Sequence, residues 1–139
     1  MDQRQIHLVQ STFAQVAPIA DQASSIFYDK LFELDPSLRA LFPADITEQR
    51  QKLMKTLGFA VNGLSDWTAA APAVRSLGAR HVGYGALPSH YATVGSALIS
   101  TLDVGLGAAF TPEVREAWVA CLGLVSSAMR DAAADELAS

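Results

Sequence analysis

The chain has 139 residues, of which half are hydrophobic and 17% are charged, and this describes one globular domain with no room for a second catalytic one. Its net charge is −4 and its ten lysines and arginines are scattered, so we expect no nucleic-acid binding. A single cysteine, Cys121, excludes an intrachain disulfide and a thiolate zinc site.

The N-terminal residues lack the apolar core of a signal peptide, and no uninterrupted apolar run reaches the roughly 18 residues of a membrane span. We therefore expect a cytoplasmic protein without a membrane span. The apolar content is somewhat higher than a domain needs to fill its own core. The excess indicates either a cavity for a large apolar ligand or a subunit interface.

Apolar residues recur at the three-to-four spacing of amphipathic helices along most of the chain, and β-branched runs are few. Pro18, Pro88 and Pro112 each suit the first turn of a helix, and Asp45 followed three residues later by Glu48 resembles a capping box. The pattern predicts an all-α domain with short connections. The expected elements are helices over about 3–17, 18–34, 46–64, 69–82, 88–106 and 112–133, with a short helical turn over 36–42.

His81 is the histidine best placed to act as a ligand. It follows Val74 and Leu77 at helical spacing, so it projects from an apolar face near the end of its helix. A lone histidine in such a place is more often an ordinary core residue than a ligand. His7 is expected to be exposed on a polar face, and His90 to have a surface or packing role at the start of its helix.

Four further residues together favour the ligand interpretation of His81. An iron porphyrin needs one neutral imidazole ligand, a slot lined by apolar groups, and a polar donor on the open side. Phe42 follows the short helical turn, Gln49 and Leu53 lie one turn apart on the next helix, and Tyr28 interrupts an apolar helix face. None of these residues is specific to haem proteins on its own. The indication comes from their order along the chain and their occurrence together.

The sequence resembles the bacterial single-domain haemoglobins, the globin domains of flavohaemoglobins and the neuroglobin-like bacterial globins. The resemblance spans nearly the whole chain and implies the globin fold, a three-over-three helical sandwich around a haem. The segments that carry it are FYDKLFELDPSLRALFP at 27–43, EQRQKLMKTL at 48–57, LGARHVGYGALPSHYATVG at 77–95 and, more weakly, REAWVACLG at 115–123.

The resemblance also implies roles for individual residues. His81 matches the proximal iron ligand, and Phe42 matches the aromatic residue that wedges the porphyrin. Tyr28 and Gln49 match the distal pair that contacts a bound gas, with Leu53 above the iron. The other positions expected to contact haem are Lys52, which matches a basic partner of a propionate, together with Leu77, Tyr84, Val94 and Tyr91, the last matching a proximal tyrosine.

Two departures from the family pattern stand out. The segment from Phe42 to Gln49 is short, so the helix that many globins insert before the distal helix is missing. Ala133 stands where flavohaemoglobins place a proximal glutamate, with Asp131 and Asp135 close in sequence. A carboxylate there would strengthen electron donation by the imidazole, so its absence argues against peroxidase-like chemistry.

The expected function is reversible binding of dioxygen, and of nitric oxide and carbon monoxide, at non-covalent haem b. Oxygen storage or delivery needs no partner, whereas nitric oxide dioxygenation or a redox or gas-sensing role would need a separate reductase or partner. The contrasting class is a globin-shaped interaction module without haem. The sequence leaves the choice between monomer and homodimer open.

Overall fold

The structure is a computed structural model, and it describes residues 1–138. All regular elements among these residues are helical, as the sequence predicts. The α-helices are α1 (Gln3–Val16), α2 (Ala20–Leu34), α3 (Thr47–Gly63), α4 (Trp67–Gly83), α5 (Pro88–Leu106) and α6 (Pro112–Ala138), and short 3₁₀ turns are η1 (Ala17–Ile19), η2 (Pro36–Leu41), η3 (Leu64–Asp66) and η4 (Gly107–Ala109).

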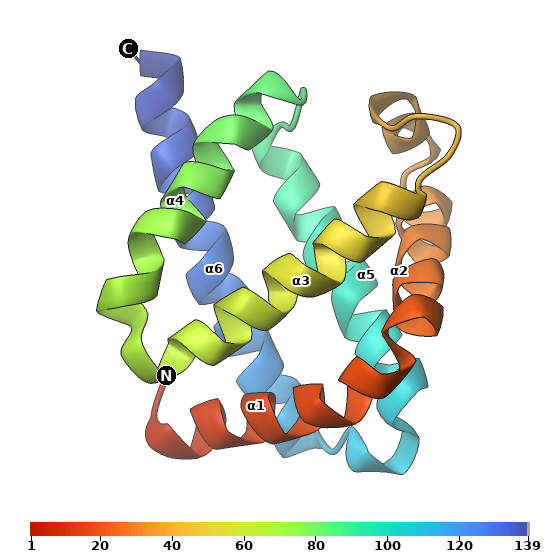
Figure 1. Ribbon diagram of the computed structural model, residues 1–139, viewed down its shortest axis with the longest axis vertical. Coiled ribbons are helices and arrows are strands. Elements are labelled where there is room, and N and C mark those ends of the chain that lie inside the picture. Colours follow the sequence, from red (N-terminus) through yellow and green to blue (C-terminus); the bar gives the residue numbers. More distant parts are fainter. Residues whose placement is uncertain (139) are drawn as a thin grey trace.

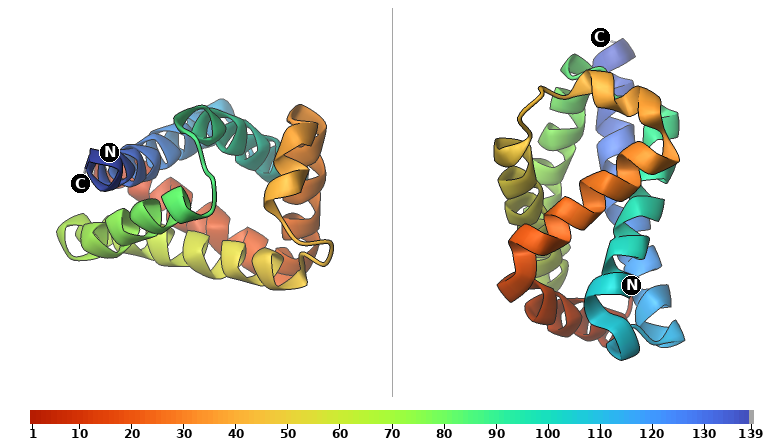
Figure 2. Two further views of the ribbon diagram at one scale, coloured as in Figure 1. Left: turned by 90° about the horizontal axis from the view of Figure 1, so that it is seen from above. Right: turned by 90° about the vertical axis from the view of Figure 1, so that its right-hand side faces the viewer.

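The helices form two layers that approach each other at one end of the molecule, and another helix connects the layers at the other end. Seen from above, α3 and α4 run along one side, α5 and α6 run along the opposite side, and α2 closes one end (Figure 2). The helix α4 packs along α6, α2 packs on α5, and α1 crosses beneath them against α6 (Figure 1). This arrangement places the facing surfaces of α3, α4 and α5 around the middle of the molecule.

The helix boundaries follow the predicted ones, with three differences. Asp45 does not form a capping box with Glu48, because its carboxylate accepts hydrogen bonds from the backbone and hydroxyl of Thr47 at 3.0 and 2.7 Å. The helix α4 begins earlier than expected, at Trp67, where the Asp66 carboxylate accepts from the Ala69 N–H. The last helix runs five residues beyond the predicted end.

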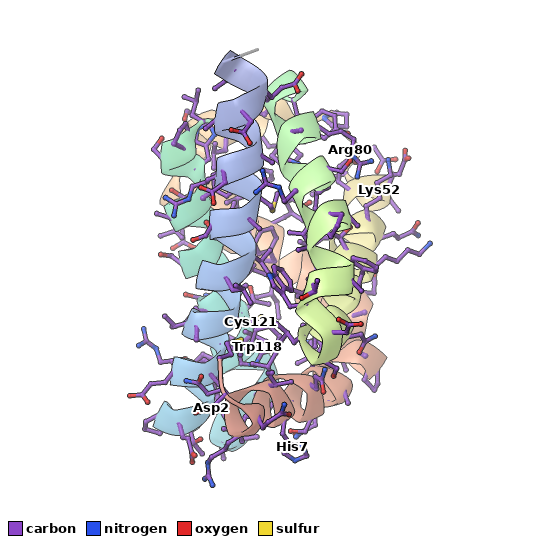
Figure 3. All side chains as sticks on the ribbon, turned by 90° about the vertical axis from the view of Figure 1, so that its left-hand side faces the viewer. Asp2, His7, Lys52, Arg80, Trp118 and Cys121 are labelled. Atoms are coloured by element: carbon purple, nitrogen blue, oxygen red, sulfur yellow. The ribbon has the colours of Figure 1, made fainter. Side chains whose placement is uncertain are left out.

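A buried cluster between α1 and α6 forms the main core. Trp118 is fully buried, and its indole N–H donates to the Thr12 hydroxyl at 2.9 Å, which in turn donates to the Leu8 carbonyl at 2.6 Å. Cys121 is also fully buried, one turn along α6, and burial raises the pKa of its thiol to about 12 (Figure 3). The core therefore leaves no polar group of these side chains unpaired except a neutral thiol.

The helices α4 and α6 approach most closely at Gly78. A Cβ atom built on Gly78 would lie 2.2 Å from the carbonyl oxygen of Met129 and 2.5 Å from its Cα atom. Both of these are backbone atoms that no side-chain rotation can move. Only glycine permits this contact, which fixes the helix that carries His81 three residues later.

We expect Gly78→Ala to destabilise the fold by about 1–3 kcal/mol, because the added methyl group forces α4 away from α6. Urea unfolding followed by circular dichroism measures this change. Gly83→Ala in the same helix is the control, since its Cβ meets nothing within 4 Å. Equal stability of the two variants would contradict the close contact.

The helix α5 has an unusual hydropathy. Together with η4 it is long and apolar enough to cross a membrane, by length and composition only, and within residues 1–138 it is alone in this. Its best window has mean hydropathy 1.3, yet only 17% of that window is buried. Core helices of globular proteins pass the same test, and α5 packs on α2 and α6. The helix therefore packs on two neighbours although few of its residues are fully buried.

Candidate functional site

An aromatic cluster from α2 and the following segment forms one wall of the site. Tyr28 is buried, and its ring centre lies 4.9 Å from that of Phe27, 5.5 Å from Phe42 and 5.9 Å from Phe32. The contacts with Phe27 and Phe42 are edge-to-face, the favoured geometry for aromatic pairs. The predicted residues Tyr28 and Phe42 are thus in direct contact, and they hold each other in place.

Arg39 braces the segment that presents Phe42. Its guanidinium donates to the carbonyl oxygens of Pro43 and Ala44 at 2.8 and 2.9 Å and lies over the Phe32 ring, 5.3 Å from its centre. These bonds fix the chain where no helix follows η2. Our sequence reasoning named neither Arg39 nor Phe32, although Phe32 lies one helical turn after Tyr28, a spacing that places both on one face.

The Tyr28 hydroxyl points from α2 toward the start of α3. It donates a long hydrogen bond, 3.4 Å, to the backbone carbonyl of Gln49. Burial raises the pKa of Tyr28 to about 12, so the phenol stays a protonated donor throughout the neutral range. A bond of this length is weak, which leaves the hydroxyl able to donate to a closer acceptor.

The side chains of α3 complete the same wall. Leu53 packs against the buried cluster that contains Tyr28, as does Val94 from α5. The side-chain oxygen of Gln49 is buried and has no hydrogen-bond partner among the described residues. A buried amide without a partner is costly, so this oxygen marks a place where a bound group would complete the packing.

His81 lies near the end of α4. It is half-buried, and its Nδ1 lies 2.7 Å from the carbonyl oxygen of Leu77. Because a carbonyl only accepts, Nδ1 carries the proton, and Nε2 has a free lone pair in the neutral ring. Burial lowers the pKa of His81, which favours that neutral form. This is the state of an imidazole that coordinates a metal.

The surroundings of His81 contain no carboxylate partner within the described residues. Tyr84 lies with its ring centre 5.3 Å from that of His81, but it is 60% exposed. The Tyr91 hydroxyl is buried and has no hydrogen-bond partner in the described chain. Ala133 is half-buried, and Asp135 pairs at the surface with Arg75 at 3.0 Å. The proximal hydrogen bond therefore comes from a backbone carbonyl alone.

Basic residues lie at the outer edge of α3 and α4. Lys52 is exposed and pairs with Glu48 on its own helix at 2.9 Å. Lys55 and Arg80 line a cavity of about 280 Å³ between these helices, whose floor includes Leu77. Figure 3 shows Lys52 and Arg80 on the same upper side of the molecule. Arg80, directly before His81, was not among the predicted site residues.

These features fit a haem. The apolar side chains around Tyr28 on α2, α3 and α5 supply a lining, His81 on α4 supplies a nitrogen donor, and the Tyr28 hydroxyl supplies a hydrogen-bond donor. Two buried polar atoms have no partner among the described residues, one on Gln49 of α3 and one on Tyr91 of α5. His7 is exposed, and Nδ1 of His90 accepts from the Leu87 N–H at 3.0 Å at the start of α5.

The fold and the site define a haem-binding, gas-binding class of protein. Residues 25–129 match the Globin family, and the chain belongs to that family. It overlays the structure of a bacterial globin from Campylobacter jejuni with a TM-score of 0.88 over 99% of this chain and 100% of that one. At 17% identity, this likeness concerns the fold alone.

Curated relatives with similar sequences come from two groups. The chain is 28% identical over 134 residues to a flavohemoprotein of Bacillus subtilis (strain 168), covering 92% of this chain and 33% of that protein. It is 30% identical over 118 residues to neuroglobins of Tetraodon nigroviridis and Danio rerio, covering 75% of this chain and 74% of each. The chain therefore spans a third of the flavohemoprotein's length.

Proposed function

We propose that this globin binds dioxygen reversibly at a non-covalent haem b, with His81 as the iron ligand, and that it stores or delivers oxygen in the cytoplasm. Haem supplies an iron that binds diatomic gases on the side opposite the histidine, nitric oxide and carbon monoxide included. The chain's own residues hold the group, exclude water and supply a hydrogen bond to the gas.

The observation that carries this proposal is the buried, protonated Tyr28 hydroxyl. Dioxygen acquires partial negative charge on binding, and a fixed donor in an apolar pocket stabilises that charge. The hydroxyl is held by the Phe27 and Phe42 rings and gives only a long bond to the Gln49 carbonyl. The hydroxyl therefore gives up only a weak hydrogen bond when it turns toward a bound gas.

The proximal side supports binding rather than peroxidase chemistry. The Leu77 carbonyl orients the His81 ring, but it carries no full negative charge. A carboxylate partner would make the imidazole more strongly electron-donating. The only cysteine, Cys121, is buried in the core cluster with Trp118, which supports a haem held without a thioether bond.

The absorption spectrum of the purified protein tests this proposal. We expect a Soret band and reversible spectral change on cycling between oxygen and argon after reduction. Absence of haem from protein purified with added haem precursor would contradict the proposal and indicate an interaction module. Oxidation without a reversible oxygenated form would reject the carrier role.

Nitric oxide dioxygenation is a second candidate, favoured by the similarity to a flavohemoprotein over 92% of the chain. The reaction leaves ferric iron, so turnover needs a reductase. Nitric oxide consumption with a supplied reductase and its cofactor separates the two roles. Sustained turnover would establish an enzyme, whereas a single stoichiometric burst would support a carrier or a sensor.

A further inference from the structure

The groove between α5 and α6 is lined by charges of one sign. The two helices pack against each other in antiparallel directions, and the groove between them has a volume of about 510 Å³ (Figure 1). Arg115 and Arg130 are in its lining, whereas no aspartate or glutamate of the described residues is. The whole chain carries a net charge of −4, so this groove is a local exception. Its volume lies within the range of small-molecule sites, about 300–1,000 Å³.

The two arginines are free to bind an anion. Both are exposed, and the side chain of neither forms an ion pair or a hydrogen bond with another described residue. An acid near the start of the same helix is already paired, since Glu113 binds Arg4. Arg115 and Arg130 lie 15 residues apart on α6, which is about 22 Å at about 1.5 Å per residue. They therefore mark the two ends of the groove.

The end of the groove at Arg130 contains a hydroxyl without a partner. Tyr91 lines the groove, and its hydroxyl oxygen is buried but bonded to no described residue. Burial raises the pKa of Tyr91 and the nearby charge of Arg130 acts in the opposite direction, so the phenol is a protonated donor at neutral pH. A buried donor without an acceptor is costly. A carboxylate bound beside Arg130 would supply the acceptor that this hydroxyl lacks.

The lining between the two arginines combines apolar side chains with free hydroxyls. Ile99, Val119 and Leu122 supply hydrocarbon. Ser100 and Ser126 supply hydroxyls that make no hydrogen bond within the described chain. Serine hydroxyls in helices often bond back to the preceding turn, whereas these two stay open to a ligand. The middle of the groove therefore suits a hydrocarbon segment with water or polar atoms along its edge.

We propose that this groove binds an extended organic dianion, a medium-chain dicarboxylate, with one carboxylate at Arg130 and Tyr91 and the other at Arg115. A guanidinium pairs with a carboxylate through two parallel hydrogen bonds, so each end of the ligand has a matched donor. The hydrocarbon between the carboxylates covers the apolar middle of the groove. Binding at one end raises the effective concentration of the other carboxylate at its arginine. The inference rests on this groove alone and not on the gas-binding role.

Calorimetric titration of the haem-loaded protein with decanedioate and dodecanedioate tests the site. We expect one saturable site per chain. Arg115→Gln alone and Arg130→Gln alone are each expected to weaken binding at least about tenfold, because each removes a charged pair of hydrogen bonds. The matched control is Lys30→Gln, which removes the same charge from α2, outside the groove lining, and is expected to leave the affinity unchanged.

Shorter and singly charged ligands test whether both arginines act together. Hexanedioate, which is too short for both ends, and decanoate, which has one carboxylate, are each expected to bind at least about tenfold more weakly than the best diacid. Equal affinity for decanoate and decanedioate would overturn the dianion and indicate a site for one carboxylate. Displacement of decanedioate by an equal concentration of inorganic phosphate would also overturn it, since the groove would then be an unselective anion site.

A blocking variant tests the groove without removing a charge. Gly123 is in the lining, and a Cβ built there would meet nothing within 4 Å, so a larger side chain fits the helix. Gly123→Phe fills the groove and is expected to abolish binding, with circular dichroism and the Soret band as checks of folding. Absence of saturable binding to the wild-type protein at about 5 mM diacid would overturn the proposal. Binding that survives all three groove substitutions would overturn it as well, since the ligand would then bind elsewhere.

Discussion

Replacing His81 with glycine is expected to abolish the Soret band of the purified protein, and added imidazole is expected to restore it. The substitution removes the only imidazole whose Nε2 is available to the site, because His7 is exposed and His90 caps α5. It also leaves a space beside Leu77 that free imidazole can fill. Absorption spectra with and without imidazole measure both effects.

The matched control is His7→Ala, which removes an exposed histidine on α1 and leaves the spectrum unchanged. Circular dichroism distinguishes loss of haem from loss of fold. A His81→Gly protein that keeps the wild-type spectrum without imidazole would show that another residue binds the iron.

Replacing Tyr28 with phenylalanine is expected to speed oxygen dissociation by about 10- to 150-fold. A hydrogen bond to a charged group contributes about 1.5–3 kcal/mol, and such differences act mostly on the dissociation rate. The phenyl ring preserves the contacts with Phe27 and Phe42, so the change isolates the hydroxyl. Stopped-flow mixing of the oxygenated protein with carbon monoxide measures the rate.

Two companion variants make this result specific. Ser24→Ala removes a buried hydroxyl one turn earlier on α2, where it donates to the Asp21 carbonyl, and is expected to leave the rate unchanged. Gln49→Leu removes the side-chain amide but keeps the backbone carbonyl that Tyr28 contacts. If Gln49→Leu accelerates dissociation and Tyr28→Phe does not, the amide is the main donor.

The helical architecture could be predicted because its signals are local. Pro88 and Pro112 begin helices where the sequence predicts them. His81 is half-buried near the end of its helix. The assignment of Tyr28 and Phe42 to one site needed the family resemblance, since no local rule joins residues on two different elements, and their ring contact was not predicted.

Features that depend on two distant segments could not be predicted. In the sequence alone, Gly78 is a residue of low helix propensity within a predicted helix. Only the packing of α4 on α6 explains why a side chain is not tolerated there. Asp45 has the spacing of a capping residue, yet its carboxylate binds the nearer Thr47. The choice of the Gln49 backbone rather than its side chain as partner of Tyr28 likewise depends on how α2 crosses α3.

The burial of Cys121 gives the molecule a built-in chemical probe. A thiol with no exposed surface and a pKa of about 12 offers almost no thiolate to an alkylating or disulfide reagent in the native state. Labelling then proceeds only through opening of the packing between α1 and α6. Its rate across a reagent series reports how often that half of the molecule opens, without any introduced residue.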